Sequence, residues 1–445
     1  MMKRDYSRAQ VYRQILGIAW PAIVEQILVM TVGIVSTAFV GRIGTRELAA
    51  VGLVNMIVTF IQTIFEGLST GSTVVIARLT GEGDVREAKR AMVQSLYVGA
   101  TAGILVALPA LAFALPILGL FFAGTDRAVL DIGLSYYRIV MFGTPFLVVD
   151  LIVAGATRGS GDMKTPMLVT LGVNALNLVL QSILVPRFGV AGSATAVLLS
   201  RIAGGSTRVA VAFLKPGPMR LGRGDDYDLR PRLIARIFKV GAPAFLEQFI
   251  MQGGFLMLQI IIIGIGVADA AAWQVSVNVN SFAFMPILGF AIATTTMIGQ
   301  SLGRRDLRGA GIYALEANVM GVAVITVIAA CSFAFARPLA SIFTTDPEVI
   351  RLSAAVISIF ACIDPFLGVM NVSAAVLRGA GDVMYVTVTA FVGLWVFRIA
   401  ASLILVRGAG MGIYGVMVGT AMDFLVRAAM YSLRVRAGRW KQRKV

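Results

Sequence analysis

Trp20-Pro21-Ala22-Ile23-Val24-Glu25-Gln26 places a proline and a carboxylate inside an apolar run, and the arrangement returns as Ala242-Pro243-Ala244-Phe245-Leu246-Glu247-Gln248. A carboxylate is costly in hydrocarbon, so it normally has a partner or a function there. A proline four residues earlier removes a helical hydrogen bond and favours a bend just before the charge. The recurrence of the segment indicates that the chain consists of two copies of one unit.

The composition is typical of a membrane protein. Of 445 residues, 58% are hydrophobic and only 14% are charged. Apolar runs of roughly 20 residues, long enough to cross the hydrocarbon core as helices, recur from end to end. The basic segment 1–13 leads into an apolar run without a small-residue cleavage site, so we expect it to be retained. The predicted fold class is an all-α membrane protein in a lipid bilayer.

Twelve transmembrane helices are predicted from these runs, six in each half of the sequence. They are expected at about residues 15–40, 48–77, 91–121, 128–157, 165–185, 190–214, 237–264, 271–301, 311–336, 349–376, 383–405 and 411–433. Several are longer than a bilayer requires, which indicates tilted, bent or protruding helices.

Basic residues gather in alternate loops, and this pattern predicts the orientation in the membrane. They are Lys3, Arg4, Arg8 and Arg13, then Arg86, Lys89 and Arg90, the basic residues from Lys215 to Lys239, then Arg304, Arg305 and Arg308, and finally Arg434, Arg436, Arg439, Lys441, Arg443 and Lys444. Both termini are therefore expected on the cytoplasmic side of the inner membrane. The net charge of +16 arises in these loops and not in a compact basic domain, so nucleic-acid binding is not expected.

Further identities relate the two halves at a nearly constant offset. Pro21, Glu25, Gln26, Gly44, Ala50, Gly67 and Gly81 match Pro243, Glu247, Gln248, Gly266, Ala272, Gly289 and Gly303, and Arg158-Gly159-Ser160-Gly161-Asp162 matches Arg378-Gly379-Ala380-Gly381-Asp382. An ordered series of this kind indicates a duplication. Six spans per copy give both copies the same topology, which predicts two pseudo-symmetric six-helix bundles facing a central cavity. The predicted domains are an N-terminal lobe (1–214), a flexible cytoplasmic linker (215–236), a C-terminal lobe (237–433) and a basic tail (434–445).

Several motifs resemble those of one transporter family. They are Phe39-Val40-Gly41-Arg42-Ile43-Gly44, Leu48-Ala49-Ala50-Val51-Gly52-Leu53, Ala77-Arg78-Leu79-Thr80-Gly81-Glu82-Gly83-Asp84, the two Arg-Gly-x-Gly-Asp loops, Asn174 with Asn177, Gly189-Val190-Ala191-Gly192, and Trp395 with Arg398. The whole chain is similar to multidrug and toxic compound extrusion (MATE) transporters of the prokaryotic type. The resemblance implies a twelve-helix, two-lobed exporter of drugs, toxins or metabolites, often cationic or amphipathic. It also implies exchange for H⁺ or Na⁺ by rocking of the lobes, without a cofactor. We expect a monomer.

The chain departs from this family at the usual coupling carboxylates. Ser36 stands where many members have a first-span aspartate, and Gln181 where some have a fifth-span aspartate. Met251 stands where another branch has a seventh-span glutamate, and Leu367 where an acidic residue precedes the tenth-span Arg-Gly. The sequence therefore requires other groups for ion coupling.

Three carboxylates lie close to the vacated positions along their helices. Glu25 and Ser36 are three turns apart on one face, about 16 Å along the axis. Glu247 lies one turn before Met251, and Asp364 nearly one turn before Leu367. We take Glu25, Glu247 and Asp364 as the candidate H⁺ or Na⁺ sites. The alternatives are that Glu25 and Glu247 bridge neighbouring helices, and that Asp364, which precedes Pro365, caps a broken helix.

Other residues receive weaker assignments. Ser36, Gln181, Met251, Phe282, Met285, Glu66 and Asp150 are candidates for lining a substrate cavity, although Glu66 and Asp150 fit a structural role better. Asp423 and Arg427 are expected to pair along the last span. Arg208 and Glu316 are expected to reach the surface from helix ends. Arg201 and Arg398 are deep cations that need acidic or carbonyl partners.

Other classes of function are less well supported. The sequence has no histidine, and Cys331 and Cys362 lie in apolar segments, so neither a metal site nor a disulfide is expected. No nucleophile motif supports a membrane-embedded enzyme, and a passive scaffold leaves the duplicated carboxylates unexplained. The main alternative is a flippase for lipid-linked sugars, whose cavity needs several arginines for pyrophosphate. An organic cation remains the expected substrate.

Overall fold

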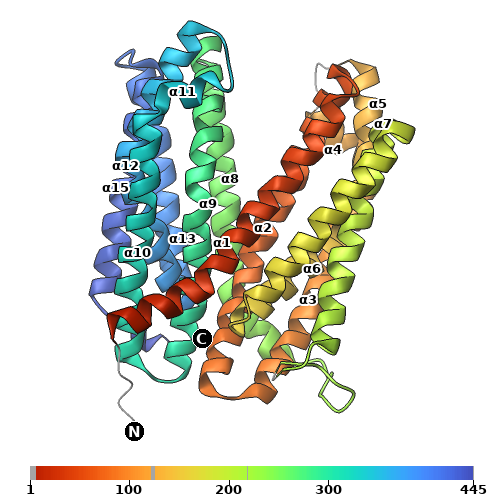
Figure 1. Ribbon diagram of the computed structural model, residues 1–445, viewed down its shortest axis with the longest axis vertical. Helices are drawn as coiled ribbons and strands as arrows, with labels where there is room; N and C mark the ends of the chain where they lie inside the picture. Colours follow the sequence, from red (N-terminus) through yellow and green to blue (C-terminus); the bar gives the residue numbers. More distant parts are fainter. Residues whose placement is uncertain (1–6, 122–125, 218, 444–445) are drawn as a thin grey trace. The chain divides into compact units, whose positions relative to one another are not determined.

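The structure, a computed structural model, describes residues 7–121, 126–217 and 219–443, and these contain helices and no strands. Lys3, Arg4, Pro218 and Lys444 lie outside the described residues. The helices are α1 (Arg8–Gly41), α2 (Thr45–Glu82), α3 (Val85–Ala112), α4 (Ala114–Phe121), α5 (Arg127–Phe142), α6 (Thr144–Gly159), α7 (Lys164–Leu214), α8 (Pro231–Ile263), α9 (Val267–Gly303), α10 (Leu307–Ala334), α11 (Ala336–Ser341), α12 (Pro347–Gly379), α13 (Val383–Phe391), η1 (Val392–Ala400), α14 (Ala401–Arg407), α15 (Gly412–Arg436) and η2 (Arg439–Gln442). The all-α class is confirmed (Figure 1).

The helices account for the twelve predicted spans. Ten helices of the described residues are long and apolar enough to cross a membrane, and α5 with α6 forms one further span that bends by 47°. The helix α7 contains two predicted spans. Its backbone leaves the helical region at Gly189 (φ 55°, ψ −132°), and this break separates the two spans. Glycine adopts this positive φ without steric cost, so the break falls between the expected spans.

Contacts divide the chain into two compact units that do not coincide with its sequence halves. Unit 1 comprises Met1–Ile23 and Leu246–Val445, and unit 2 comprises Val24–Phe245. Each of α1 and α8 therefore belongs to both units. The changes fall two residues after Pro21 and Pro243, inside the duplicated segment. The two lobes predicted at 1–214 and 237–433 stay a prediction.

Unit 1 is built on α9, α10, α12 and α15, which run side by side in Figure 1. The first turns of α1 join this bundle, because Val11, Ile15 and Ala19 are buried in its core. Gln14 accepts a hydrogen bond from Tyr313 of α10. Burial of apolar side chains from both ends of the sequence stabilises this part of the fold.

Unit 2 is built on α2, α3, α6 and α7, with the first turns of α8 packed against α2. At Gly67, a Cβ atom would lie 2.6 Å from the carbonyl oxygen of Ala244, and at Gly71 it would lie 2.4 Å from that of Ile237. Only glycine allows the two backbones to approach this closely. The Gly-x-x-x-Gly spacing in α2 thus serves close helix packing.

The segment predicted to be a flexible linker makes contacts with α3 in unit 2. Lys89 of α3 forms an ion pair with Asp225 at 3.0 Å, and Arg90 pairs with Asp226 at 2.8 Å. Gln94 donates to the carbonyl oxygen of Asp228 at 3.0 Å. Proline, glycine and charge indicated flexibility, but the charges have complementary partners on a neighbouring helix.

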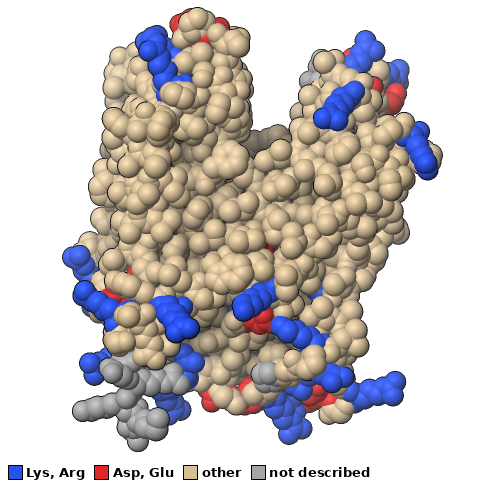
Figure 2. Space-filling view, viewed as in Figure 1, with Lys and Arg blue, Asp and Glu red and all other residues tan. Residues whose placement is uncertain are grey.

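Charged side chains on the face seen in Figure 2 gather near the helix ends of each unit, and the surface between these ends is largely uncharged. Large exposed apolar side chains such as Leu105, Val179, Ile260 and Ile404 lie within the spans. An apolar band of this kind matches a lipid environment.

Candidate functional site

In unit 2, the first duplicated carboxylate lies in a buried ionic cluster. The Glu25 side chain of α1 is only 2% exposed, and its Oε1 is 3.6 Å from Nη2 of Arg208 in α7. Arg208 also forms an ion pair with Asp150 of α6, and its Nη2 donates to Thr170 at 2.9 Å. Arg208 was expected to reach the surface, but it is 6% exposed, because these partners satisfy it inside the bundle.

The cluster is short of positive charge. Counted in their charged forms, the two carboxylates Glu25 and Asp150 exceed the one guanidinium that they share, Arg208, by one negative charge. Within the described residues, Oε2 of Glu25 is buried without a hydrogen-bond partner. A buried carboxylate oxygen without a hydrogen-bond partner is costly, so this oxygen is a candidate position for a ligand.

A column of amides on α7 continues from this cluster. Asn174 donates to the carbonyl oxygen of Leu28 at 2.6 Å, and Asn177 donates to Ser200 at 3.1 Å. Gln181 donates to Ser36 at 3.1 Å, so these two predicted residues do lie together. The side-chain oxygens of all three amides are buried without a donor among the described residues. Such oxygens are suited to a hard cation.

In unit 1, the second duplicated carboxylate has a different environment. Arg378 donates to both oxygens of Glu247, from Nη2 at 2.5 Å and from Nε at 3.3 Å. The pair joins α8 to the end of α12. A carboxylate held by a bidentate guanidinium is already compensated, which is the helix-bridging alternative considered for this residue.

Asp364 lies inside the continuous helix α12, so it does not cap a broken helix. Its side chain is 1% exposed, and Oδ2 accepts a hydrogen bond from Asn280 of α9 at 2.9 Å. Its Oδ1 is buried without a partner among the described residues. Asp364 therefore resembles Glu25 more than Glu247 does.

A second ionic cluster occupies the last helices of unit 1. Asp423 and Arg427 pair along α15, as predicted, and Arg398 of η1 also binds Asp423.

The other deep cation, Arg201 in unit 2, donates to the carbonyl oxygen of Val140 at 3.1 Å. Glu316, expected at the surface, is instead 6% exposed and lies 3.5 Å from Arg8.

The remaining cavity candidates lie on several helices. Glu66 is exposed and accepts from Gln62 at 3.3 Å, whereas Asp150 belongs to the Arg208 cluster. Phe282 is 59% exposed and Met285 is half-buried on α9. The predicted apolar wall at these two residues stays a prediction.

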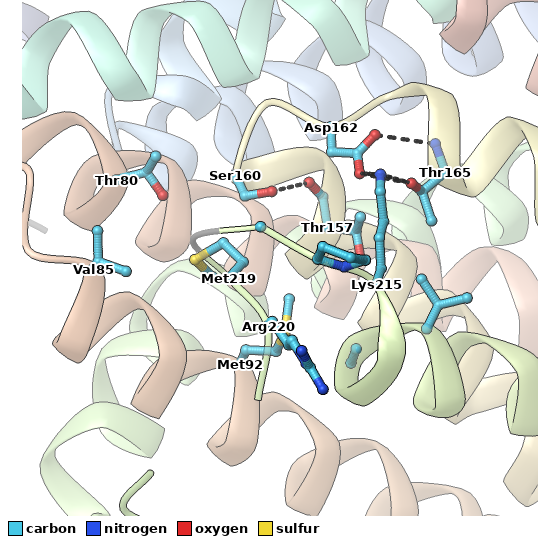
Figure 3. Close-up of a pocket in the computed structure, with 14 residues that line it drawn as sticks. Thr80, Val85, Met92, Thr157, Ser160, Asp162, Thr165, Lys215, Met219 and Arg220 are labelled. Atoms are coloured by element: carbon cyan, nitrogen blue, oxygen red, sulfur yellow. Dashed lines mark hydrogen bonds and ion pairs between the residues drawn. The ribbon is translucent and has the colours of Figure 1, made fainter. Parts of the chain in front are cut away.

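A cavity of about 240 Å³ lies where α6 and α7 meet the segment after α7 (Figure 3). Figure 3 shows Lys215 reaching Asp162 and Thr165 beside it. Burial raises the pKa of Asp162, but hydrogen bonds from Lys215 and Thr165 outweigh this effect and lower it overall. The carboxylate is thus held ionised by fixed partners, and the cavity belongs to the packing of the helix ends.

The family profile of MatE matches residues 21–183 and 243–404, which together are most of the chain and reproduce its duplication. The chain belongs to the MatE family. Probable multidrug resistance protein NorM of Thermotoga maritima is 26% identical, over 98% of this chain and 94% of that protein. The protein of the same name from Deinococcus radiodurans is 28% identical over 96% of each.

The fold is also found among solved structures of MATE transporters. One, described as the outward-facing conformation of a multidrug resistance MATE family transporter, matches with a TM-score of 0.89 and 23% identity, covering 98% of this chain and all of that one. Membership of the MatE family makes this chain a multi-pass membrane transporter and not an enzyme. Among the described residues of this chain, Glu25 and Asp364 each have a buried carboxylate oxygen without a hydrogen-bond partner.

Proposed function

We propose that this protein is a secondary active exporter of amphipathic small molecules, chiefly organic cations, in exchange for H⁺ or Na⁺. The proposal is supported by the names of its relatives as multidrug resistance proteins. The observation that carries it is that, among the described residues, each unit contains one deeply buried carboxylate with an unpartnered oxygen, Glu25 in unit 2 and Asp364 in unit 1.

Exchange follows from competition for these carboxylates. A proton neutralises a buried carboxylate, and Na⁺ compensates it through oxygen ligands, which the amides of α7 supply near Glu25. An organic cation compensates the same charge. Because one carboxylate cannot hold both cations favourably, entry of the ion favours release of the substrate.

Glu247 serves a structural role in this proposal, because Arg378 already binds both its oxygens. The basic residues Arg86, Lys89 and Arg304 support a cytoplasmic position for the α2–α3 and α9–α10 connections, with the protein in the inner membrane. Alternating access by rocking of two lobes remains part of the proposal. The flippase alternative is weaker, because Arg208 and Arg378 are occupied by carboxylates.

The test is uptake of a fluorescent organic cation by inverted membrane vesicles under separate proton and sodium gradients. Glu25→Gln and Asp364→Asn should each lower gradient-driven uptake at least tenfold, while the exposed surface carboxylate variant Glu82→Gln, 44% exposed, should retain it. The gradient that drives uptake identifies the coupling ion. Gradient-driven uptake that persists in the Glu25→Gln, Asp364→Asn double variant contradicts the proposal.

A further inference from the structure

Two arginines share a single carboxylate inside unit 1. Arg427 of α15 donates to both oxygens of Asp423, each at 2.5 Å, and Arg398 of η1 lies 3.0 Å from Oδ2 of the same residue. The exposed fractions of Arg398, Arg427 and Asp423 are 5%, 4% and 0%. All three lie within helices that are long and apolar enough to span a membrane. The arginine cluster, as we call these three residues, is therefore shielded from water by the bundle.

The arginine cluster carries one surplus positive charge. Glu247 is close enough to act electrostatically on Arg427, but both of its oxygens accept hydrogen bonds from Arg378. Adding this pair leaves the sum unchanged at plus one. An uncompensated guanidinium in a low-dielectric interior is costly, and an anion removes that cost.

The surplus coincides with free hydrogen-bond donors. Nε of Arg398 is buried without an acceptor among the described residues. Nη1 of Arg427 faces the sulfur of Met251 at 3.8 Å, and a thioether is only a weak acceptor. Arg427 therefore meets a thioether at a position where a carboxylate would neutralise the surplus charge.

A π-helical turn and two aromatic rings surround Arg398 in the arginine cluster. Arg398 lies in the π-helical segment η1, a rare conformation that occurs often at functional sites. The guanidinium of Arg398 lies 4.9 Å from the ring centre of Phe424 and 5.9 Å from that of Phe255. Nε1 of Trp395, three residues earlier in the chain, is also buried without an acceptor among the described residues. Two aromatic rings thus lie against the guanidinium of Arg398.

We propose that Arg398 and Arg427 form a binding site for a carboxylate group carried on an apolar or aromatic body. A singly charged carboxylate balances the surplus of one, and its two oxygens match the planar donors of guanidinium groups. Phe255 and Phe424 supply apolar contact for the body of the molecule. The site lies wholly in unit 1 and goes beyond the proposed function, because it selects an anionic group instead of an organic cation.

The test measures binding to the purified full-length protein without any ion gradient, so it is independent of the proposed antiport. Thermal unfolding is followed while benzoate, benzyl alcohol or benzylammonium is added, since a ligand of the folded state raises the midpoint as its concentration exceeds Kd. Benzoate should raise the midpoint of the wild-type protein, and the neutral and cationic probes should not do so at the same concentrations.

Two substitutions at one position separate charge from shape. Met251→Glu supplies the missing carboxylate and should weaken benzoate binding at least tenfold, whereas the matched neutral variant Met251→Gln should stay within about threefold of wild type, a difference under about 1 kcal/mol. Arg398→Gln removes the surplus by the opposite route, leaves Asp423 paired with Arg427, and should also weaken binding at least tenfold. Equal stabilisation by benzoate and benzylammonium, or unchanged benzoate binding in Met251→Glu or Arg398→Gln, would overturn the assignment.

Discussion

Replacing Glu247 by glutamine should destabilise unit 1 and leave ion coupling intact. Arg378 donates to both Glu247 oxygens, and the side chains of Arg378 and Glu247 are 21% and 8% exposed. Removing one partner of a buried ion pair costs about 3–5 kcal/mol, because the other charge remains uncompensated. Because the Arg378 side chain is partly exposed to solvent, we expect a loss of stability at the lower end of this range, about 3 kcal/mol.

The loss is measurable as a fall in the thermal unfolding midpoint of the purified protein. For a unit of this size, each kcal/mol corresponds to about 2–4 °C, so the Glu247→Gln midpoint should fall by about 6–12 °C. Arg378→Gln should have a similar effect. The double variant should recover part of the loss, because two neutral amides replace the isolated charge and can bond to each other.

Transport distinguishes this role from ion coupling. Vesicles with equal amounts of folded Glu247→Gln protein should still accumulate the fluorescent cation when a gradient is applied. An unchanged midpoint together with lost gradient-driven uptake would refute the reasoning. That result would show that Glu247 carries the coupling ion despite its contact with Arg378.

Three further outcomes are expected. Asp364→Glu, which keeps the carboxylate, should retain more gradient-driven uptake than Asp364→Asn in vesicles containing equal amounts of protein. Gly393→Ala should lower the unfolding midpoint, because the added Cβ would lie 2.4 Å from Oδ1 of Asp423. Burial raises the pKa of Asp225, but hydrogen bonds from Lys89 and the backbone outweigh this effect and lower the pKa overall. The ionised carboxylate therefore stabilises the attachment of the linker to α3 at neutral pH. This stabilisation is lost as the pH falls below the ordinary carboxyl range. The measurement is the release of peptides from the linker by pepsin. Linker cleavage in the wild type should therefore increase with acidity. In Lys89→Met, cleavage should already be high at the mildest pH tested.

The sequence was sufficient for the spans and the duplication, because both depend on local composition and on repeated residues. Apolar runs predict helices wherever they are long enough, and the break at Gly189 separates two spans that the sequence had already divided. The composition of α1 does not show that its first turns pack in unit 1. That arrangement depends on contacts with helices far along the chain, such as the hydrogen bond between Gln14 and Tyr313.

The partners of the buried charges were the least predictable part of the candidate site. The pair Asp423 and Arg427 lies four residues apart on one helix, so local geometry predicts it. Arg208 reaches Asp150 and Glu25 on two other helices, which requires the relative register of all three. The π-helical turn that places Arg398 beside Asp423 has no sequence signal of its own in this chain.

The duplicated segment has diverged in its electrostatics while keeping its residues. Glu25 shares Arg208 with a second carboxylate, which leaves an excess of acid in unit 2. Glu247 pairs with Arg378. Asp423 pairs with both Arg427 and Arg398, so this cluster of unit 1 has one more guanidinium than carboxylates. Glu25 contacts Arg208 of α7, whereas Glu247 contacts Arg378 of α12, so the two duplicated carboxylates contact arginines from different helices. A duplication therefore supplies two similar scaffolds, and charged side chains on other helices, Asp150 and Arg208 in unit 2 and Arg398, Asp423 and Arg427 in unit 1, give the two units different ionic clusters.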